Sequence, residues 1–366
     1  GQALALGERH LGLAAPNPSV GALLVDERAD RPTILARAVT GRGGRPHAER
    51  LALDAAGERA RGASLFVTLE PCAHHGRTPP CAEAVIEAGV ARVVCGLEDP
   101  DPRVAGTGFR LLREAGIELV TGILEPQCRR LHAGHIMRVT RGRPYVTLKL
   151  ARTADGFAAR AQGRLLITGP IANAQTHLLR ARSDAVMVGV GTVLADDPEL
   201  TCRLPGLASR NPIRVVLDAR LRTPLDAKLI LSARETPSLV IAAGDASRDA
   251  EARLAEAGVE VLRVAVAANG LLDLGSALAA LAARGATLVM CEGGPFLANE
   301  LARQGLIDEA VLITSARALG EQGLPALGPF LEEAISQGRL ACAQGLTFGE
   351  DRWDSYEGRR ACSPGS

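Results

Sequence analysis

The chain has 366 residues, more than a single hydrophobic core usually organises, so the sequence predicts two domains. Hydrophobic residues make up 47% and charged residues 23%, which is typical of a globular protein. A formal charge of +1 without a basic run, and an aromatic content of 2%, argue against nucleic acid as a partner, because they provide neither a backbone-binding patch nor stacking platforms.

No run of about 20 apolar residues occurs, so we expect no membrane-spanning segment. No charged-then-apolar leader opens the chain either, and we therefore expect a cytoplasmic protein. Its eight cysteines are then expected to be reduced or bound to metal. Gly1 lies inside an expected helix, so we expect the native N-terminus to lie upstream.

The first part of the chain alternates β-branched runs with Ala-rich helical stretches, which predicts a sheet covered by helices. The expected strands are Ser19–Val25, Ser64–Leu69 and Ala91–Leu97. The expected helices are His47–Arg61 and Cys81–Gly89. The second helix is expected to have Thr78 as its N-cap and Pro79 and Pro80 in its first turn, and to stop at Gly89.

The segment Arg138–Pro144 is basic and contains Gly and Pro, which predicts an exposed connection between domains of residues 1–140 and 145–366. A second α/β series follows, and the polar end Gly358–Ser366 is expected to fray. The strands expected in this series are Tyr145–Leu150, Ala185–Gly189, Ile213–Leu217, Leu239–Ala242, Val259–Val264, Thr287–Cys291 and Ala310–Thr314.

Three residues of the first half have the chemistry of a catalytic zinc site. His47 opens a helix, Cys72 follows a strand and Cys81 opens the next helix. One imidazole and two thiolates leave the fourth tetrahedral position open for water. Glu49, two residues after His47, points in a different direction and is expected to transfer protons between water and a departing amine.

Each piece alone is weak, because a lone His-x-Glu is usually a surface pair and a lone Cys a small buried hydrophobe. In combination, His-x-Glu followed by Pro-Cys and a further Cys is the signature of zinc deaminases, here with eight residues between the cysteines. The loop between them carries His74 and Arg77, which are suited to a substrate phosphate, whereas His75 is expected to bond within the loop. The remaining cysteines and histidines are expected to be structural: Cys95, Cys128, Cys202, Cys291, Cys342, Cys362, His10, His132, His135 and His177.

Both halves contain long, specific motifs, in chain order PNPSVG, PHAE, TLEPCAHHGRTPPC, DPDPRVAGTG, LKLARTADG, LITG, LLRARSDAVMVGVGTVLADDPELTCR, PIRVVLD and CEGGP. In composition and order these motifs closely resemble those of the bifunctional deaminase/reductase family of riboflavin biosynthesis. The resemblance implies a cytidine-deaminase-like three-layer α/β/α domain followed by a dihydrofolate-reductase-like α/β domain. It also implies zinc-dependent deamination of a diaminopyrimidinone ribosyl phosphate, NADPH-dependent reduction of the ribosyl group to ribityl, and a homo-oligomer, either dimer or tetramer.

The resemblance also implies roles for single residues. His47, Cys72 and Cys81 would bind zinc, and Glu49 would move the proton. The implied substrate contacts are Asn17, His74 and Arg77 in the first half and Arg180, Leu200, Arg203 and Glu292 in the second. The implied cofactor contacts are Ala151, Leu166, Thr192, Asp196, Gly293, Gly294 and Pro295.

Physical chemistry supports some of the roles implied for residues of the second half. Arg180 and Arg203 are suited to a sugar phosphate, and Gly293-Gly294 before a helix permits phosphate binding at the helix N-terminus. Without the resemblance, this half is only a nucleotide-using α/β domain. Gly189-Val190-Gly191 lacks a third glycine and favours a turn over a dinucleotide-binding loop.

The chain departs from the common family pattern at several positions: Leu166 where Trp is frequent, Ala172-Asn173 in place of an Arg-rich helix start, Thr40 where His is frequent, a long Asp26–Arg37 segment, and Thr314–Gly320 without a common Pro. One alternative is therefore an active deaminase with a weak or scaffold-only reductase domain. A zinc-stabilised binding module and a nucleic-acid deaminase are two others. Glu49 and the missing fourth ligand argue against the former, and the near-zero charge argues against the latter.

Overall fold

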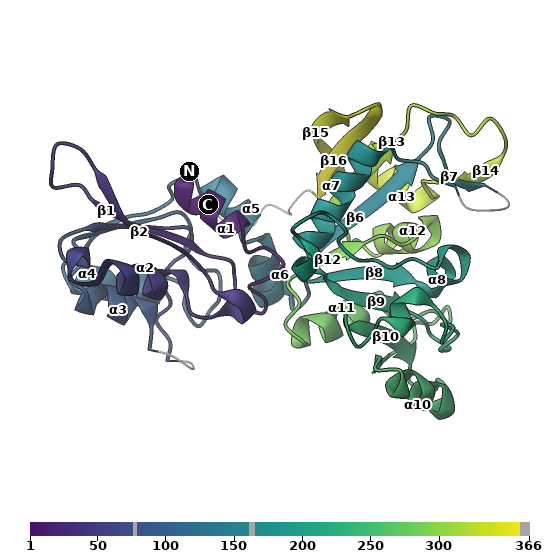
Figure 1. The fold of residues 1–366 in the computed structure, drawn as a ribbon, viewed down its shortest axis with the longest axis horizontal. Coiled ribbons are helices and arrows are strands. Elements are labelled where there is room, and N and C mark those ends of the chain that lie inside the picture. Colours follow the sequence, from purple (N-terminus) through teal and green to yellow (C-terminus); the bar gives the residue numbers. More distant parts are fainter. Residues whose placement is uncertain (76–78, 161–164, 359–366) are drawn as a thin grey trace. The chain divides into compact units, whose positions relative to one another are not determined.

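The computed structural model describes residues 1–75, 79–160 and 165–358. The chain divides into two compact units (Figure 1). The first comprises Gly1–Pro144 and the short segment Arg284–Thr287, and the second comprises Tyr145–Ala283 and the residues from Leu288 on. Among the described residues, no helix is both long and apolar enough to cross a bilayer.

The first unit is built on a five-stranded sheet. Its strands are β1 (Gly21–Asp26), β2 (Thr33–Val39), β3 (Ser64–Val67), β4 (Arg92–Cys95) and β5 (Glu118–Val120). They lie in the order β2-β1-β3-β4-β5, in which β1 is antiparallel to both neighbours and β3, β4 and β5 are parallel. The carboxyl ends of β3 and β4 therefore meet at one edge, where the chain continues into Cys72 and Asp99.

Two layers of helices cover this sheet (Figure 1). The helices are α1 (Gln2–Glu8), α2 (Ala48–Ala56), α3 (Cys81–Glu87), α4 (Thr107–Glu114), α5 (Glu125–Leu131) and α6 (Ala133–Arg141), with 3₁₀ turns η1 (Arg42–Gly44) and η2 (Gly57–Ala60). Helix α3 contacts α2 and α4, whereas α5 contacts α1 and α6. Leu24 and Leu65 of the sheet pack with Ala52, Val85 and Leu112 of α2, α3 and α4. This apolar core fixes the starts of α2 and α3, which carry the candidate ligands.

The second unit contains a nine-stranded sheet and a two-stranded ribbon. Its strands are β6 (Tyr145–Arg152), β7 (Phe157–Arg160), β8 (Ala185–Gly189), β9 (Ile213–Leu217), β10 (Ser238–Ala243), β11 (Glu260–Val264), β12 (Leu288–Cys291), β13 (Glu309–Thr314), β14 (Gly323–Pro325), β15 (Leu340–Phe348) and β16 (Asp351–Gly358). The sheet order is β11-β10-β9-β8-β12-β6-β13-β16-β15, and β14 pairs with β7. The strands from β11 to β13 in this order are parallel, and β16 and β15 add an antiparallel edge.

Helices follow most strands of this sheet: α7 (Pro170–Ala181), α8 (Val190–Asp196), α9 (Lys228–Leu231), α10 (Arg248–Glu256), α11 (Leu274–Ala283), α12 (Pro295–Arg303) and α13 (Pro329–Ser336), with a 3₁₀ turn η3 (Ala208–Arg210). Strands β8 and β10 are buried along nearly their whole length, which explains their continuous apolar sequences. Val188, Val216 and Val240 form one core with Leu229 and Leu254 of the flanking helices. The predicted α/β class is confirmed.

Most predicted strands are found within two residues of their expected bounds, and β8 and β9 match to the residue. The division between the units falls at the end of the predicted connection Arg138–Pro144, but its first four residues belong to α6, which ends where Gly142 adopts a positive φ of 66°. Arginine side chains in the last turn of a helix interact favourably with the helix dipole, and this accounts for the basic composition of the segment.

Three expectations about helix ends need correction. Pro79 and Pro80 precede α3 instead of forming its first turn, with Pro80 at the N-cap position, and the expected cap Thr78 lies outside the described residues. Helix α2 ends at Ala56, earlier than expected. The turn expected at Gly189–Gly191 is absent from the structure, because β8 passes directly into α8.

The sequence did not reveal several strands: β2, β5, β7, β14, β15 and β16. In β15 the reason is that most residues are exposed and carry no apolar alternation. Gly358 closes β16 and is therefore part of a strand. The rest of the end expected to fray, residues 359–366, lies outside the described residues, as does Cys362.

Candidate active sites

The structure brings the three predicted zinc ligands together. One ligand atom each from His47, Cys72 and Cys81 lies within 4.8 Å of the others. His47 Nδ1 lies 3.3 Å from Cys81 Sγ and 3.6 Å from Cys72 Sγ, so one edge of the imidazole faces both sulfur atoms. Two sulfurs and one imidazole nitrogen at this spacing fit a zinc ion with one coordination position left for water.

Local structure explains this convergence. His47 is the N-cap residue of α2, and Cys81 is the first residue of α3. Cys72 is held at the start of α3, because its carbonyl accepts a hydrogen bond from Ala82 N at 3.1 Å and its Sγ lies 3.3 Å from Cys81 N. Hydrogen bonding with Cys81, followed by that with His47, lowers the pKa of the Cys72 thiol to about 4. The site thus favours a thiolate, the form that binds metal.

Glu49 lies beside this set without belonging to it. Its side chain is 3% exposed, in the first turn of α2. Burial, and then the neighbouring Cys72 thiolate, raise the pKa of Glu49 to about 7, although the charge of His47 opposes the shift. A carboxyl group with a pKa near neutrality can both accept and return a proton, which general acid–base catalysis requires.

A cavity of about 110 Å³ opens onto these residues. His47, Glu49 and Cys72 line it together with the predicted substrate contacts Asn17 and His74. Asn17 Nδ2 donates to Gly44 O at 2.9 Å and lies 3.4 Å from His47 Nε2. Gly44 has a φ of 83°, and a Cβ there would lie 2.6 Å from the Asn17 Cβ, so only glycine permits this approach.

His75, unlike its neighbour His74, does not line the cavity. His75 forms a pair with Glu83 of α3 at 3.2 Å and is largely exposed. The expected bond within the loop is therefore replaced by a bond to the next helix. The third predicted substrate contact, Arg77, lies outside the described residues.

Sequence reasoning missed several charged residues that line the same cavity: Arg45, Asp99, Asp101, Arg103, His135 and Arg138. His135 Nε2 lies 2.9 Å from Asp99 Oδ1, although His135 was expected to be merely structural. Arg103 holds the Asp101 carboxylate and lowers its pKa to about 2. Arg45 lies two residues before His47, but the others come from the chain after β4 and from α6, so the sequence offers no spacing that would link those to the ligands.

Glu70, also in the cavity wall, ties the chain after β4 to the ligand segment. Its Oε2 accepts hydrogen bonds from Asp99 N at 3.1 Å and Gly106 N at 3.0 Å, and its Oε1 accepts one from Phe109 N at 3.1 Å. Gly106 and Phe109 belong to the N-terminus of α4, so the Glu70 carboxylate caps this helix from a distant part of the chain. The TLEPC motif therefore contributes a structural carboxylate next to Cys72.

In the second unit, the predicted cofactor contacts meet at one edge of the sheet. β8, β12 and β6 are parallel neighbours, so Ala151 near the end of β6, the β8–α8 junction and the Gly293-Gly294 segment after β12 lie at the same carboxyl edge. Gly294 is the N-cap residue of α12 and Pro295 its first residue. Open backbone N–H groups at such a helix start can bind phosphate.

The remaining predicted cofactor contacts lie on exposed structure. Thr192 is half-buried in the first turn of α8, and Asp196 is exposed at its end. Leu166 precedes α7 and is 78% exposed.

Two predicted substrate contacts bind each other. Arg180 Nε and Nη2 lie 2.5 and 2.8 Å from the two carboxylate oxygens of Glu292. Both side chains are buried, and Lys149 lies close enough to lower the pKa of Glu292 as Arg180 does. Burial lowers the pKa of Lys149, while Glu292 opposes this shift. The carboxylate is therefore held as an anion between two cationic side chains.

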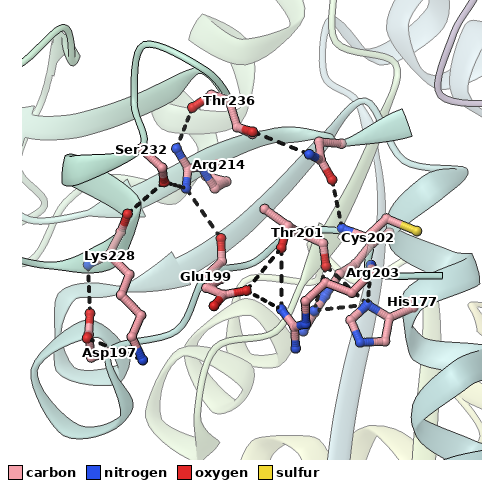
Figure 2. A network of polar contacts seen from close by, with 12 residues as sticks. His177, Asp197, Glu199, Thr201, Cys202, Arg203, Arg214, Lys228, Ser232 and Thr236 are labelled. Carbon is pink, nitrogen blue, oxygen red and sulfur yellow. Dashed lines mark hydrogen bonds and ion pairs between the residues drawn. The ribbon is translucent and has the colours of Figure 1, made fainter. Parts of the chain in front are cut away.

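The other two predicted contacts follow α8. Leu200 is buried and has a φ of 55°, which bends the chain sharply. The Arg203 side chain is 52% exposed, and its Nη1 lies 2.9 Å from Glu199 Oε2 (Figure 2). Thr201 O accepts a hydrogen bond from Arg180 Nη1 at 3.0 Å, which joins this segment to the buried ion pair. Arg203 is thus the more accessible of the two predicted phosphate ligands.

Comparisons of the sequence with known families cover both units. Residues 2–97 match the cytidine and deoxycytidylate deaminase zinc-binding region, and residues 144–352 match the RibD C-terminal domain. The chain is 40% identical to the riboflavin biosynthesis protein RibD of Aquifex aeolicus, over 87% of this chain and 86% of that protein. It is 38% identical to RibD of Escherichia coli, over 96% and 94% of the two chains.

Solved structures give the same result. RibD of Acinetobacter baumannii superposes with a TM-score of 0.85 at 35% identity and covers 98% of this chain and 97% of its own. A diaminohydroxyphosphoribosylaminopyrimidine deaminase/5-amino-6-(5-phosphoribosylamino)uracil reductase of Thermotoga maritima superposes with a TM-score of 0.83 at 32% identity, over the same shares of the two chains. These similarities span both units.

Proposed function

Because this chain belongs to the RibD family of riboflavin biosynthesis proteins, we propose that it catalyses two successive steps of that synthesis. The first is hydrolytic deamination of 2,5-diamino-6-ribosylamino-4(3H)-pyrimidinone 5′-phosphate. The second is reduction of the ribosyl group to ribityl by NADPH. The observation that carries the proposal is the convergence of His47, Cys72 and Cys81 beside the buried carboxyl group of Glu49.

The donor set fits a zinc ion held by His47, Cys72 and Cys81. Bound there, zinc supplies the Lewis acidity that makes water a nucleophile at neutral pH. Glu49 is proposed to take the proton of the attacking water and to give it to the departing amine, which leaves as ammonia. Its pKa of about 7 suits both transfers. Asn17 and His74 line the cavity and are proposed to orient the pyrimidine, with Arg77 as a third contact.

The second unit needs no protein nucleophile, because the hydride comes from bound NADPH. Gly293, Gly294 and Pro295 fit a cofactor phosphate at the start of α12, and Ala151, Leu166, Thr192 and Asp196 are proposed to complete this site. Arg203 and Arg180 are proposed to bind the substrate phosphate and sugar, with Leu200 beside them. Glu292, held as an anion by Arg180, is proposed to stabilise the positive charge on the sugar carbon that accepts the hydride.

The family relationship also supports proposals about the domain bounds, the cellular location and the number of subunits. The deaminase domain would comprise residues 1–140 and the reductase domain residues 145–366. The enzyme would act on a small molecule in the cytoplasm and would assemble as a homodimer or homotetramer. Size-exclusion chromatography with light scattering measures the number of subunits directly.

A product analysis tests the proposed function. The zinc-loaded protein is incubated with the diaminopyrimidinone ribosyl phosphate, with and without NADPH, and the products are identified by mass spectrometry. We expect the deaminated ribosyl product without NADPH and the ribityl product with it. Glu49→Gln keeps the shape of the side chain but cannot carry the proton, so deamination should fall by at least about 100-fold. This variant should still reduce the deaminated compound.

The outcomes separate the two halves. Absence of ammonia release by the wild-type protein would refute the deaminase assignment. Deamination without ribityl product would leave only the alternative in which the second unit is a scaffold. Full deamination by Glu49→Gln would show that another group moves the proton.

A further inference from the structure

His177 lies between the two arginines proposed to bind the reductase substrate. It belongs to α7, one turn before Arg180, and its side chain is 5% exposed. The sequence offered no partner for it, and it was expected to be structural. Figure 2 shows its imidazole against the backbone of the segment that carries Thr201, Cys202 and Arg203.

The contacts of His177 Nδ1 define its state. Nδ1 lies 3.2 Å from Arg203 N, 3.1 Å from Thr201 O and 3.5 Å from Arg180 Nη1. Thr201 O already accepts a hydrogen bond from Arg180 Nη1 at 3.0 Å, whereas the Arg203 N–H needs an acceptor. A neutral imidazole with its proton on Nε2 presents a lone pair to that N–H.

The surroundings favour this neutral form. Burial lowers the pKa of His177, and the positive charges of Arg180 and Arg203 lower it further. The carbonyl of Thr201 and the carboxylate of Glu292 oppose the shift, but Glu292 is engaged by Arg180. Nδ1 can therefore serve as an acceptor.

The segment around Arg203 is fixed at several other points. Cys202 N donates a hydrogen bond at 2.9 Å to Oδ1 of Asn211, which lies just before β9. Glu199 O lies 3.4 Å from Nη1 of the fully buried Arg214 on β9. Asp197 Oδ1 accepts a hydrogen bond from Lys228 N at 2.9 Å. Helix α7 joins this set of contacts through the Arg203 N–H, which lies against His177, and through Thr201 O, which accepts from Arg180.

We propose that His177 is a positioning residue of the reductase site: by accepting a hydrogen bond from Arg203 N, it places the Arg203 guanidinium for the phosphate of the ribosyl substrate. This inference rests on the reductase activity proposed above. His177 does not touch the reacting carbon or the cofactor in this role. Its loss should therefore weaken substrate binding more than it slows hydride transfer.

Two amide substitutions test the bond itself. The side-chain oxygen of His177→Asn can occupy the position of Nδ1, whereas the longer His177→Gln reaches the position of Nε2 and leaves Arg203 N without an acceptor. His177→Leu removes both polar atoms. We expect His177→Gln and His177→Leu to raise the KM for the deaminated substrate about tenfold, the loss of one buried hydrogen bond. His177→Asn should stay within about threefold of the wild type, and the KM for NADPH and the kcat should change little in all three variants.

Ser183→Ala is the matched control, because Ser183 lies just after α7 and its hydroxyl donates only to Leu179 O of that helix, at 2.9 Å, among the contacts that the structure shows. It should leave the substrate KM unchanged. Deamination by every variant serves as an internal check on the protein preparation. Binding of ribose 5-phosphate, measured by calorimetry, provides a readout that does not depend on turnover. Its affinity should rank the variants in the same order as the substrate KM does.

The proposal is overturned if folded His177→Gln and His177→Leu keep the wild-type KM and ribose 5-phosphate affinity, or if His177→Asn is as impaired as His177→Gln. A wild-type protein that deaminates but does not reduce would refute the proposed reductase activity instead. The ribose 5-phosphate measurement would then still decide the role of His177. If His177→Leu fails to fold, the two amide variants decide.

Discussion

A single buried imidazole makes the stability of the first unit depend on pH. His132 is 1% exposed, its Nε2 lies 3.0 Å from Thr68 Oγ1, and burial lowers its pKa to about 3. The unfolded chain protonates this histidine near pH 6.5, whereas the folded unit keeps it neutral until about pH 3. Between these values the unfolded state binds more protons, so this contribution to stability is lost as the pH falls.

We predict that His132→Gln flattens the acid side of the stability curve of the first unit. The slope between pH 6 and 4 should decrease by about 1.4 kcal/mol per pH unit, the value for one proton. Urea unfolding, followed at several pH values by a probe in the first unit, measures this slope. The control is His75→Asn, which leaves His132 intact and should keep the wild-type slope. An unchanged slope in His132→Gln would contradict the prediction.

Single residues could be predicted where they stand in a motif with specific chemistry. His47, Cys72 and Cys81 stand in short patterns whose chemistry is specific, so their convergence could be expected from the sequence. His177 and His135 acquire their partners through tertiary structure, from residues 26 and 36 positions away. An isolated histidine carries no signal of such a partner, and its interpretation as structural was the natural expectation.

Among the elements, α4 depends on a carboxylate from outside the helix. Glu70 accepts hydrogen bonds from Gly106 N and Phe109 N at the start of α4 and from Asp99 N. In addition, a Cβ on Gly108 would lie 2.1 Å from Pro71 O, so α4 packs directly against the chain that leads to Cys72. The position of one zinc ligand and the start of α4 are therefore coupled.

We predict that Glu70→Gln destabilises the first unit by about 1–3 kcal/mol, because its NH₂ group would face backbone donors that a carboxylate now satisfies. Zinc affinity and deamination should fall with it, while reduction of the deaminated compound should stay unchanged. Zinc competition with a chromogenic chelator and both activity assays measure these effects. Glu83→Gln on the exposed face of α3 is the control. Unchanged zinc affinity in a destabilised Glu70→Gln would separate the cap from the metal site.

Several of the strands that the sequence revealed are almost wholly buried. β8, β9 and β10 are nearly continuous apolar runs, and burial on both faces produces that pattern. β15 is largely exposed and β2 is mostly half-buried, so their strand character depends on pairing with β16 and β1. Helix ends were harder to predict than strands. Helix α6, for example, continues through a basic, Gly-bounded segment whose composition also suits a loop.

At the scale of the whole molecule, two units with separate sheets carry the two sites. We predict that removal of zinc by a chelator abolishes deamination but leaves the reduction of the deaminated compound within about twofold. Circular dichroism should show that most of the fold is retained, because the first unit has its own apolar core. Parallel loss of both activities on chelation would contradict independent sites. Global unfolding of the first unit would indicate a structural metal.

The strand order of the second unit has a consequence for synthesis on the ribosome. In the first unit, β1 pairs with β2 and β3, which follow within about 45 residues, so this unit can form as soon as its chain emerges. In the second unit, β6 emerges first, but its neighbours β12 and β13 begin at residues 288 and 309, and β16, which pairs with β13, begins only at residue 351. Until β12 emerges, β6 is an unpaired central strand of the nascent chain. A ribosome that stalls late in the message would therefore release a chain that can deaminate its substrate but cannot yet reduce it.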